Sequence, residues 1–245
     1  MTIDPEQLRN HLVAAAIAGA VATPRANNLA NIRRTIAGDE KVTFGIDFVG
    51  EWTFDRLFEV MVRRVGINGD LSYDGIDTID PDRTMDRLSA LRDRLRMAAS
   101  RRETVLLATG HPANLLPVHT AIAGRLRTAG CNVVRGEVEN VYFLSGVHAL
   151  RRCGDLLHTH RPGYMRDLLA ALPSHPDLVV ADHGWAGAAA QLGIETVGFA
   201  DCNDPGLFVG EEQGSMVVTV PLDDGVAPHL YDPMIEFLLD GVGPS

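Results

Sequence analysis

The sequence predicts an α/β protein: a Rossmann-like three-layer αβα fold with a mostly parallel sheet and a helical N-terminal portion. From residue 103 onward, short apolar stretches alternate with segments of helical length, which is typical of βαβ units and a parallel sheet. The preceding residues are helix-rich and dense in arginine and aspartate. The length of 245 residues and the 46% hydrophobic composition allow one large domain, or a core with a smaller cap. We therefore expect residues 1–100 to cover the site and residues 101–245 to form the core, with one continuous domain as the alternative.

The N-terminal portion is predicted to contain several helices and one strand. Asp4 and Pro5 fit the N-cap and the first position of a helix that continues through the apolar residues 12–22. Residues 42–48 form a strand candidate, and residues 52–65 place apolar side chains at helical spacing. An acidic, turn-rich connection and a charged helix follow, at residues 74–82 and 84–101.

The core is predicted to alternate between strands and helices. We expect its strands at residues 104–108, 132–134, 178–181, 196–200 and 216–220, with a further apolar stretch that ends at residue 157. We expect its helices at residues 114–128, 164–172, 185–192 and 228–239. Open parallel sheets bind ligands just beyond the carboxyl ends of their strands. The strand predictions therefore also predict where the site lies.

The charge and the cysteine content argue against several functions. The formal net charge of −10 is unsuited to binding nucleic acid or an anionic membrane surface. Lys41 is the only lysine, so no Walker P-loop is present, and no nucleotide cofactor is evident. The cysteines are odd in number and lack C-x-x-C spacing, and no apolar run is long enough to span a membrane. We expect a cytoplasmic protein without disulfides, and the sequence leaves a homodimer open.

Two segments are candidates for binding phosphate. Thr109, Gly110 and His111 form a glycine turn that opens a helix, where backbone N–H groups and the helix dipole suit an anion. A plain structural turn explains the same residues equally well. In the N-terminal portion, Arg25 with Asn28 could clamp a phosphate, and a polar turn between helices is the alternative.

Acidic and amide side chains follow two successive strands of the predicted core. Asp201, Asn203 and Asp204 lie within four residues, and oxygen ligands of this kind suit Mg²⁺ or Mn²⁺. Asp182 follows the preceding strand and could face the same ion. Because Asp204 precedes Pro205, it also fits a helix N-cap. We therefore favour Asp182, Asp201 and Asn203 as the main ligands, and caps and turns alone are the alternative.

Histidines supply the remaining candidates. His158 and His160 share one side of the chain if that segment is extended, where they could bind a metal or a phosphate. His111 and His183 lie just past strand ends, where an imidazole can act as a general acid toward a leaving-group oxygen. The Asp223-Asp224 pair either adds charge to this edge or forms a turn, and we favour the turn. The other histidines are expected to be surface or core residues: His11, His119, His148, His175 and His229.

Four segments together resemble a bacterial protein family described only as "phosphatase": residues 23–25, 109–112, 181–184 and 200–205. The resemblance extends from Thr23 to the Asp223-Asp224 pair, after which this chain has Gly225 where the family often has asparagine. It implies hydrolysis of a phosphomonoester without naming a substrate. The Asp and Asn residues at the strand ends are also similar, in architecture only, to metal-dependent damage-control phosphatases.

Together these features predict a metal-dependent phosphatase that acts on a small phosphorylated metabolite. Asp182, Asp201 and Asn203 would hold Mg²⁺ or Mn²⁺. The turn at Gly110 and His111, together with Arg25, would bind phosphate oxygens, and His183 or His160 would orient water or protonate the leaving group. Two other functions fit the same residues: a lyase, cyclase or isomerase acting on a sugar or carboxylate, and a non-catalytic protein that binds a nucleotide or metabolite.

Overall fold

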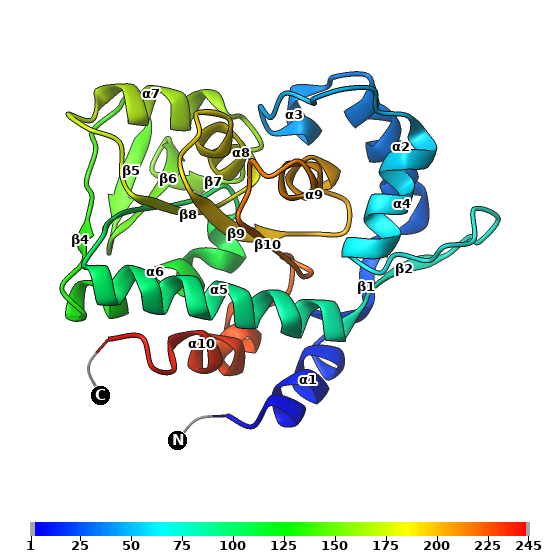
Figure 1. The fold of residues 1–245 in the computed structure, drawn as a ribbon, viewed down its shortest axis with the longest axis horizontal. Helices are drawn as coiled ribbons and strands as arrows, with labels where there is room; N and C mark the ends of the chain where they lie inside the picture. The colour runs from blue at the N-terminus through cyan, green and yellow to red at the C-terminus, as the bar shows by residue number, and fades with distance from the viewer. Residues whose placement is uncertain (1–2, 244–245) are drawn as a thin grey trace.

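The computed structural model describes residues 3–243 and shows a mixed α/β fold around a largely parallel sheet (Figure 1). The strand order is β10-β9-β8-β3-β6-β5, with β4 paired to β3 and β7 paired to β6. Strands β10, β9, β8, β3 and β6 run parallel, whereas β5 and β7 run antiparallel to β6. The predicted α/β class with a mostly parallel sheet is confirmed.

The strands of the sheet are β3 (Thr104–Thr109), β4 (Asn132–Val133), β5 (Val141–Leu144), β6 (Val147–Arg152), β7 (Asp155–Leu157), β8 (Leu178–Asp182), β9 (Thr196–Ala200) and β10 (Val218–Pro221). Its helices are α5 (Pro81–Arg101), α6 (Pro112–Thr128), α7 (Gly163–Ala171), α8 (His183–Gln191), α9 (Pro205–Glu212) and α10 (Asp232–Leu239), the last preceded by a 3₁₀ turn at Pro228–Tyr231. Helices α5 and α6 cover one face, and α7, α8 and α9 cover the other, which gives three layers (Figure 1).

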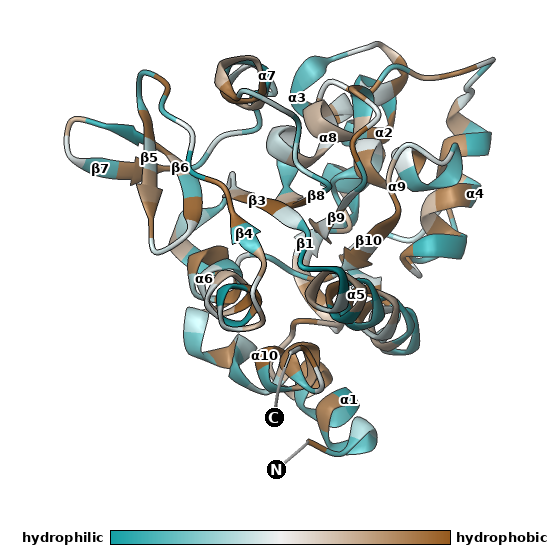
Figure 2. Ribbon diagram, turned by 60° about the vertical axis from the view of Figure 1, so that its left-hand side comes forward, coloured by the Kyte–Doolittle hydropathy of each residue, from teal (hydrophilic) through white to brown (hydrophobic). Residues whose placement is uncertain are grey.

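The sheet is apolar because both of its faces are covered. In Figure 2 the strands are mostly brown, whereas helices such as α5 mix brown and teal. Strands β8, β9 and β10 are buried at every position, which explains why they appear in the sequence as continuous apolar runs. The buried core is continuous and includes Leu8 near the start of the chain and Val242 near its end.

The N-terminal portion contains α1 (Pro5–Ala14), β1 (Gly19–Pro24), α2 (Arg25–Ile36), α3 (Glu40–Thr43), α4 (Phe54–Arg64) and β2 (Ile76–Ile79). The helix expected through residues 12–22 is wrong in its second half, because Ala16 and Gly19 have left-handed backbone conformations and β1 follows. The strand expected at residues 42–48 is also wrong. Asp39 caps the short helix α3, and Phe44 and Gly45 then have positive φ, which excludes a strand. The connection expected at residues 74–82 contains β2, which pairs antiparallel with β1.

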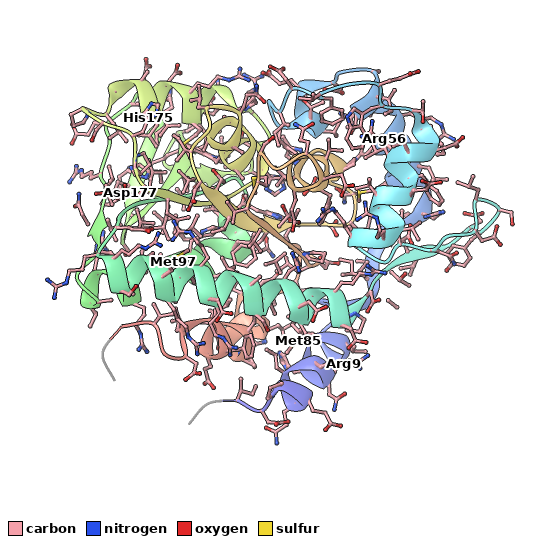
Figure 3. The ribbon with its side chains drawn as sticks, in the orientation of Figure 1. Arg9, Arg56, Met85, Met97, His175 and Asp177 are labelled. Atoms are coloured by element: carbon pink, nitrogen blue, oxygen red, sulfur yellow. The ribbon has the colours of Figure 1, made fainter. Side chains whose placement is uncertain are left out.

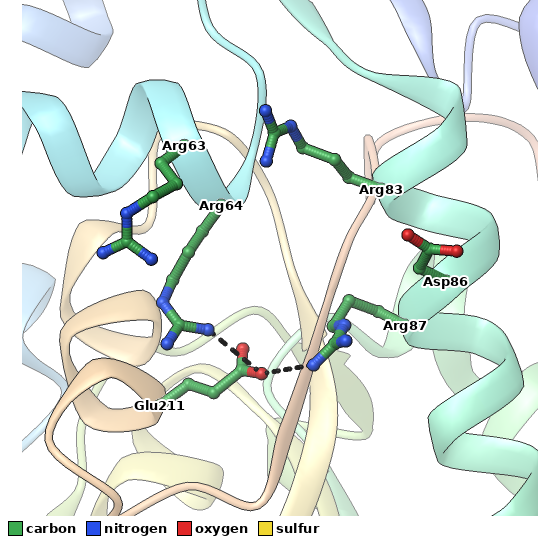
Figure 4. Close-up of a pocket in the computed structure, with 6 residues that line it drawn as sticks. All are labelled: Arg63, Arg64, Arg83, Asp86, Arg87 and Glu211. Carbon is green, nitrogen blue, oxygen red and sulfur yellow. Dashed lines mark hydrogen bonds and ion pairs between the residues drawn. The ribbon is translucent and has the colours of Figure 1, made fainter.

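Charged contacts join the N-terminal helices to the rest of the molecule. Arg9 of α1 lies next to α5, near Met85, and forms an ion pair with Asp82 (Figure 3). A second set of contacts surrounds a pocket of about 210 Å³ between α4, α5 and α9. There the Glu211 carboxylate accepts contacts from Arg64 and Arg87 at 3.2 and 3.0 Å (Figure 4). Within residues 3–243, no helix is both long and apolar enough to cross a membrane.

Candidate active site

The topology brings several strand ends to one edge of the sheet. Because β3, β8, β9 and β10 are parallel, the residues that follow them emerge at the same edge. Strand β7 runs antiparallel to β6, and its last residue, Leu157, pairs with Leu150. The neighbouring Ala149 pairs with Thr109, at the end of β3. The chain therefore leaves β7 at this edge too, and residues from five strands meet there.

Four imidazoles form the centre of this edge; we call His111, His158, His160 and His183 the histidine cluster. The ring of His183 lies 5.7, 5.1 and 4.6 Å from those of His111, His158 and His160. His111 and His158 stack with their ring centroids 4.4 Å apart. His183 is buried, whereas His158 is exposed. The cluster therefore extends from the interior to the surface.

Asp182 fixes the orientation of the His183 ring. The Nδ1 of His183 lies 2.8 Å from Oδ1 of Asp182, so this ring nitrogen donates to the carboxylate and Nε2 faces away from it. His183 is also the first residue of α8 and has a φ of 48°, in the left-handed region. This conformation is uncommon for a residue with a side chain, and such residues concentrate at functional sites.

Asp182 is fully buried, and both of its oxygens have partners. Oδ1 also accepts the Gly110 N–H at 2.6 Å, and Oδ2 lies 3.0 Å from Nε2 of His119. The His111 N–H donates to the Thr109 hydroxyl at 3.0 Å. Both amides therefore already have partners within the protein, so the structure does not favour the phosphate cradle expected from Gly110 and His111.

Asp204 and Asp224 face Nε2 of His183. Their Oδ2 atoms lie 3.5 and 3.3 Å from this nitrogen, and Oδ1 of Asp224 lies 3.1 Å from Nδ1 of His111. Asp204 is only 1% exposed, and its Oδ1 has no hydrogen-bond partner within residues 3–243. Asp204 stands at the N-cap position of α9, but its side chain makes no cap hydrogen bond, so the capping role expected for it is wrong.

Two overlapping groups of these side chains could hold a metal ion. One is His183, Asp204 and Asp224, and the other is His111, His158 and His183. Within each group the ligand atoms lie within 4.8 Å of one another. Imidazole nitrogen and carboxylate oxygen are common ligands of divalent metals. The edge thus offers a mixed nitrogen and oxygen site.

The carboxylates and imidazoles shift one another's pKa values. Burial would lower the pKa of His183, but Asp204, Asp182 and Asp224 outweigh it and raise that pKa to about 10. Burial raises the pKa of Asp204 to about 7, although His183 opposes this. Burial and the charge of His183 lower the pKa values of His158 and His160 to about 4. The interior of the site therefore attracts positive charge, while His158 and His160 are neutral at pH 7.

Asp201 and Asn203 lie beside this group and bind each other. The Asn203 amide and the Thr23 hydroxyl donate to Oδ2 of Asp201, at 2.6 and 2.9 Å. The Cys202 N–H donates to Oδ1 at 2.6 Å. Burial, together with the nearby Asp224 and Asp204, raises the pKa of Asp201 well above its usual value. The structure thus gives these two residues partners within the protein.

Arg25 and Asn28 meet on a buried carboxylate. Nη1 of Arg25 lies 2.9 Å from Oδ2 of Asp77, and the Asn28 amide donates to the same oxygen at 2.8 Å. Arg25 is 1% exposed and also lies over the ring of Phe58. The structure therefore supplies a protein partner for the charge that the sequence assigned to phosphate.

Helix α3 closes one side of the histidine cluster. Nδ1 of His160 donates to the Lys41 carbonyl at 2.8 Å, and the Phe44 ring lies 5.3 Å from that of His160. The loop at residues 158–161 also packs on α8, since a Cβ on Gly184 would lie 2.3 Å from the His160 carbonyl. The position of His160 is thus set by the N-terminal portion on one side and by the sheet layer on the other.

Sequence reasoning missed two members of the site. Asp224 was expected in a turn, yet it is buried and touches two imidazoles. His119 was expected to be an ordinary surface or core residue, yet it binds Asp182. A signal for His119 exists, because it shares a buried helix face with Leu115, Val118 and Ile122, where an imidazole needs a partner.

Comparisons with known proteins identify the family of the chain. The model of a family described as "Phosphatase" matches residues 3–245. The chain is also 45% identical over 250 residues to a Streptomyces coelicolor protein named "Phosphatase SCO2771", covering 97% of this chain and 95% of that protein. The chain therefore belongs to the Phosphatase family, and it is a hydrolase.

Proposed function

We propose that this phosphatase is a divalent-metal-dependent phosphomonoesterase that acts on small phosphorylated metabolites. One observation carries the proposal: His183, Asp204 and Asp224 converge behind three further imidazoles at the carboxyl edge of a parallel sheet. A phosphomonoester is dianionic, and its hydrolysis needs positive charge on the phosphoryl oxygens and a means of moving protons.

The residues present fit a bound cation. Oδ1 of Asp204 is buried without a partner in the described chain, and three carboxylates surround the buried imidazole of His183. We assign the cation to His183, Asp204 and Asp224, with His111 and His158 next to them. Asp182, Asp201 and Asn203 are less suitable as ligands because their side chains already hold hydrogen bonds. The mixed donor set favours Mn²⁺ over Mg²⁺, which prefers oxygen ligands alone.

Such a cation would supply Lewis-acid stabilisation to the phosphoryl oxygens. Asp182 holds Nδ1 of His183, which fixes the ring so that Nε2 faces Asp204 and Asp224. His160 uses its Nδ1–H on the Lys41 carbonyl, which leaves the lone pair on Nε2. We propose that Nε2 of His160 is the general base that accepts the proton of the attacking water.

The test combines metal removal with a pair of adjacent variants. Phosphate release from p-nitrophenyl phosphate should stop after chelation and return with Mn²⁺ more than with Mg²⁺. Asp224→Asn should lower kcat/KM by at least about 100-fold, because a ligand carboxylate is lost. Asp223→Asn is the matched control and should leave kcat/KM within about twofold, since within residues 3–243 the Asp223 carboxylate accepts hydrogen bonds only from the Ala22 and Gly225 N–H groups.

Metal dependence would be refuted by activity that survives both chelation and Asp224→Asn. Equal losses in the two variants would instead show that the effect of Asp224 is structural.

A further inference from the structure

A pocket of about 360 Å³ opens beside the histidine cluster. His158 and His160 of that cluster line it, so it is continuous with the proposed reaction site. Its remaining lining residues are Arg34, Lys41, Thr159 and Arg161. The volume lies at the lower end of the range for small-molecule sites. The pocket is therefore large enough for more of a substrate than its phosphate group.

The positive charges of this pocket are only partly matched within the protein. Arg34 forms an ion pair with Asp39 at 2.8 Å. The side chains of Lys41 and Arg161 make no ion pair or hydrogen bond with any residue in the described range 3–243. Glu40, the residue before Lys41, is bound to Arg166. Two cations thus line the pocket without an ion-pair partner in residues 3–243, although Lys41 lies close enough to Asp39 to help lower the pKa of that carboxyl.

In the arginine-lined pocket of Figure 4, by contrast, the arginines have carboxylate partners. There Glu211 binds Arg64 and Arg87, and Glu212 binds Arg63 at 2.8 Å. Those arginines hold helices together. Lys41 and Arg161, in the pocket beside the histidine cluster, form no such ion pair within residues 3–243.

The backbone fixes where these cations stand relative to the site. The carbonyl of Lys41 accepts the hydrogen bond from His160, so the only lysine of the chain is tied to a cluster residue. Arg161 directly follows His160, and its N–H donates to the Thr159 hydroxyl at 3.1 Å. The hydrogen bond between His160 and the Lys41 carbonyl therefore fixes the backbone positions of both cations.

We propose that the substrate carries a second anionic group, a carboxylate or a phosphate, which Arg34, Lys41 and Arg161 bind while the phosphomonoester lies at the histidine cluster. The inference rests on the proposed function and adds the substrate class to it. Arginine and lysine bind carboxylate and phosphate through charge-assisted hydrogen bonds, and an exposed pocket lets such a group enter from solvent.

Substrate pairs that differ in one anionic group test the inference. Glycerol 3-phosphate and 3-phosphoglycerate form the carboxylate pair, and fructose 6-phosphate and fructose 1,6-bisphosphate form the phosphate pair. For at least one pair, the wild-type enzyme should show kcat/KM about tenfold higher for the member with the extra anion. The double variant Lys41→Met/Arg161→Met should reduce this preference by about tenfold, mainly through KM. Arg135→Met is the control and should leave the preference unchanged, because Arg135 is an exposed arginine whose contacts are with Glu137 and Phe143 rather than with this pocket.

The pair that shows the preference identifies the second group. A wild-type enzyme without preference in either pair, or a preference that the double variant retains, would overturn the inference. If no probe is hydrolysed, the proposed function fails, and thermal stabilisation by the same four compounds tests binding separately. The two-anion compounds should then raise the Tm of the wild type more than their partners, and this difference should vanish in the double variant.

Discussion

Asp182 is the residue through which the structure sets the orientation of His183. It is fully buried and joins the Gly110 amide, His119 and His183 on one carboxylate. Hydrogen bonds from His119 and His183 outweigh its burial and hold the pKa of Asp182 well below its usual value. It is therefore an anion at all pH values near neutrality, and its negative charge is part of the environment of His183.

Asp182→Asn should weaken Mn²⁺ binding and lower kcat/KM by about 10- to 100-fold, because the amide cannot accept from all three donors. Competition with a chelating dye measures the Mn²⁺ affinity. This affinity distinguishes the loss of His183 orientation from a general loss of folded structure. His119→Gln keeps a donor for Asp182 and should lose less affinity than His119→Ala. Unchanged Mn²⁺ affinity in Asp182→Asn would contradict this role.

His148 makes the protein sensitive to acid at a position away from the site. It accepts the Gly136 N–H at Nε2 and donates from Nδ1 to the Leu107 carbonyl. Burial lowers its pKa from 6.5 to about 4. Between about pH 6.5 and pH 4, His148 therefore binds a proton in the unfolded chain but not in the folded one. The free energy of unfolding falls as the pH falls through this range.

We expect the His148→Gln variant to be less stable than the wild type at pH 7, and the gap to narrow by about 2 kcal/mol at pH 4.5. Urea unfolding at the two pH values measures this. The wild type should lose more stability than the variant on acidification, and a gap that stays constant would show that His148 titrates normally.

The sequence predicted which residues follow the strands at the candidate site, but it did not predict the side chains that contact them. Asp182, His183, His111 and Asp204 follow parallel strands, and a general rule for such sheets places them at one edge. The roles of Asp224 and His119 depend on strand order and on which helix covers which face. A one-dimensional sequence does not contain that information, so an acidic pair after β10 looked like any turn.

At the scale of elements, the packing of the His160 loop on α8 depends on a glycine. A Cβ at Gly184 would lie 2.3 Å from the His160 carbonyl and 2.6 Å from the Arg161 carbonyl carbon. Gly124 in α6 is a matched comparison, because a Cβ there would meet nothing within 4 Å.

Gly184→Ala should destabilise the protein by about 1–3 kcal/mol and lower kcat/KM, since the loop must move away from the cluster. Gly124→Ala should instead stabilise it by about 0.5–1 kcal/mol, as alanine is the better helix former. Urea unfolding and p-nitrophenyl phosphate hydrolysis check both variants. Similar stability changes of the same sign would refute the close packing.

Prediction succeeded for the buried βα units and failed for half-exposed elements. Strands β3, β8 and β9 were found within a residue or two because both faces are covered and their sequences are uniformly apolar. The hairpin β5–β6 was missed, since β5 alternates between partly buried and exposed positions and a Ser145-Gly146 turn interrupts the pattern. Tertiary contacts rather than local propensity determine such strands.

At the scale of the whole molecule, the N-terminal portion is attached to the sheet by backbone bonds as well as by side chains. The Asp223 N–H donates to the Ile17 carbonyl at 2.8 Å, and the Asp223 carboxylate accepts the Ala22 N–H at 3.1 Å. These contacts lie at the end of β10, beside the site. We expect the two portions to unfold together.

The fluorescence of the two tryptophans can show whether the two portions unfold together, because Trp52 lies in the N-terminal portion and Trp185 lies in α8. In Trp52→Phe, the fluorescence of Trp185 should follow the far-UV circular dichroism through urea unfolding. In Trp185→Phe, the fluorescence of Trp52 should do the same. Separate midpoints for fluorescence and dichroism within either variant would reveal independently folding units.

The spread of the cluster along the chain has a consequence for synthesis. The histidine cluster and the carboxylates that face it run from His111 to Asp224, and the lysine beside them is at position 41. Translation delivers the N-terminal residues first, and domains fold as their chain emerges. Asp224 is the last of these residues to be synthesised. A nascent chain that stops before residue 224 therefore lacks a carboxylate of the proposed metal site, however well its earlier strands have folded.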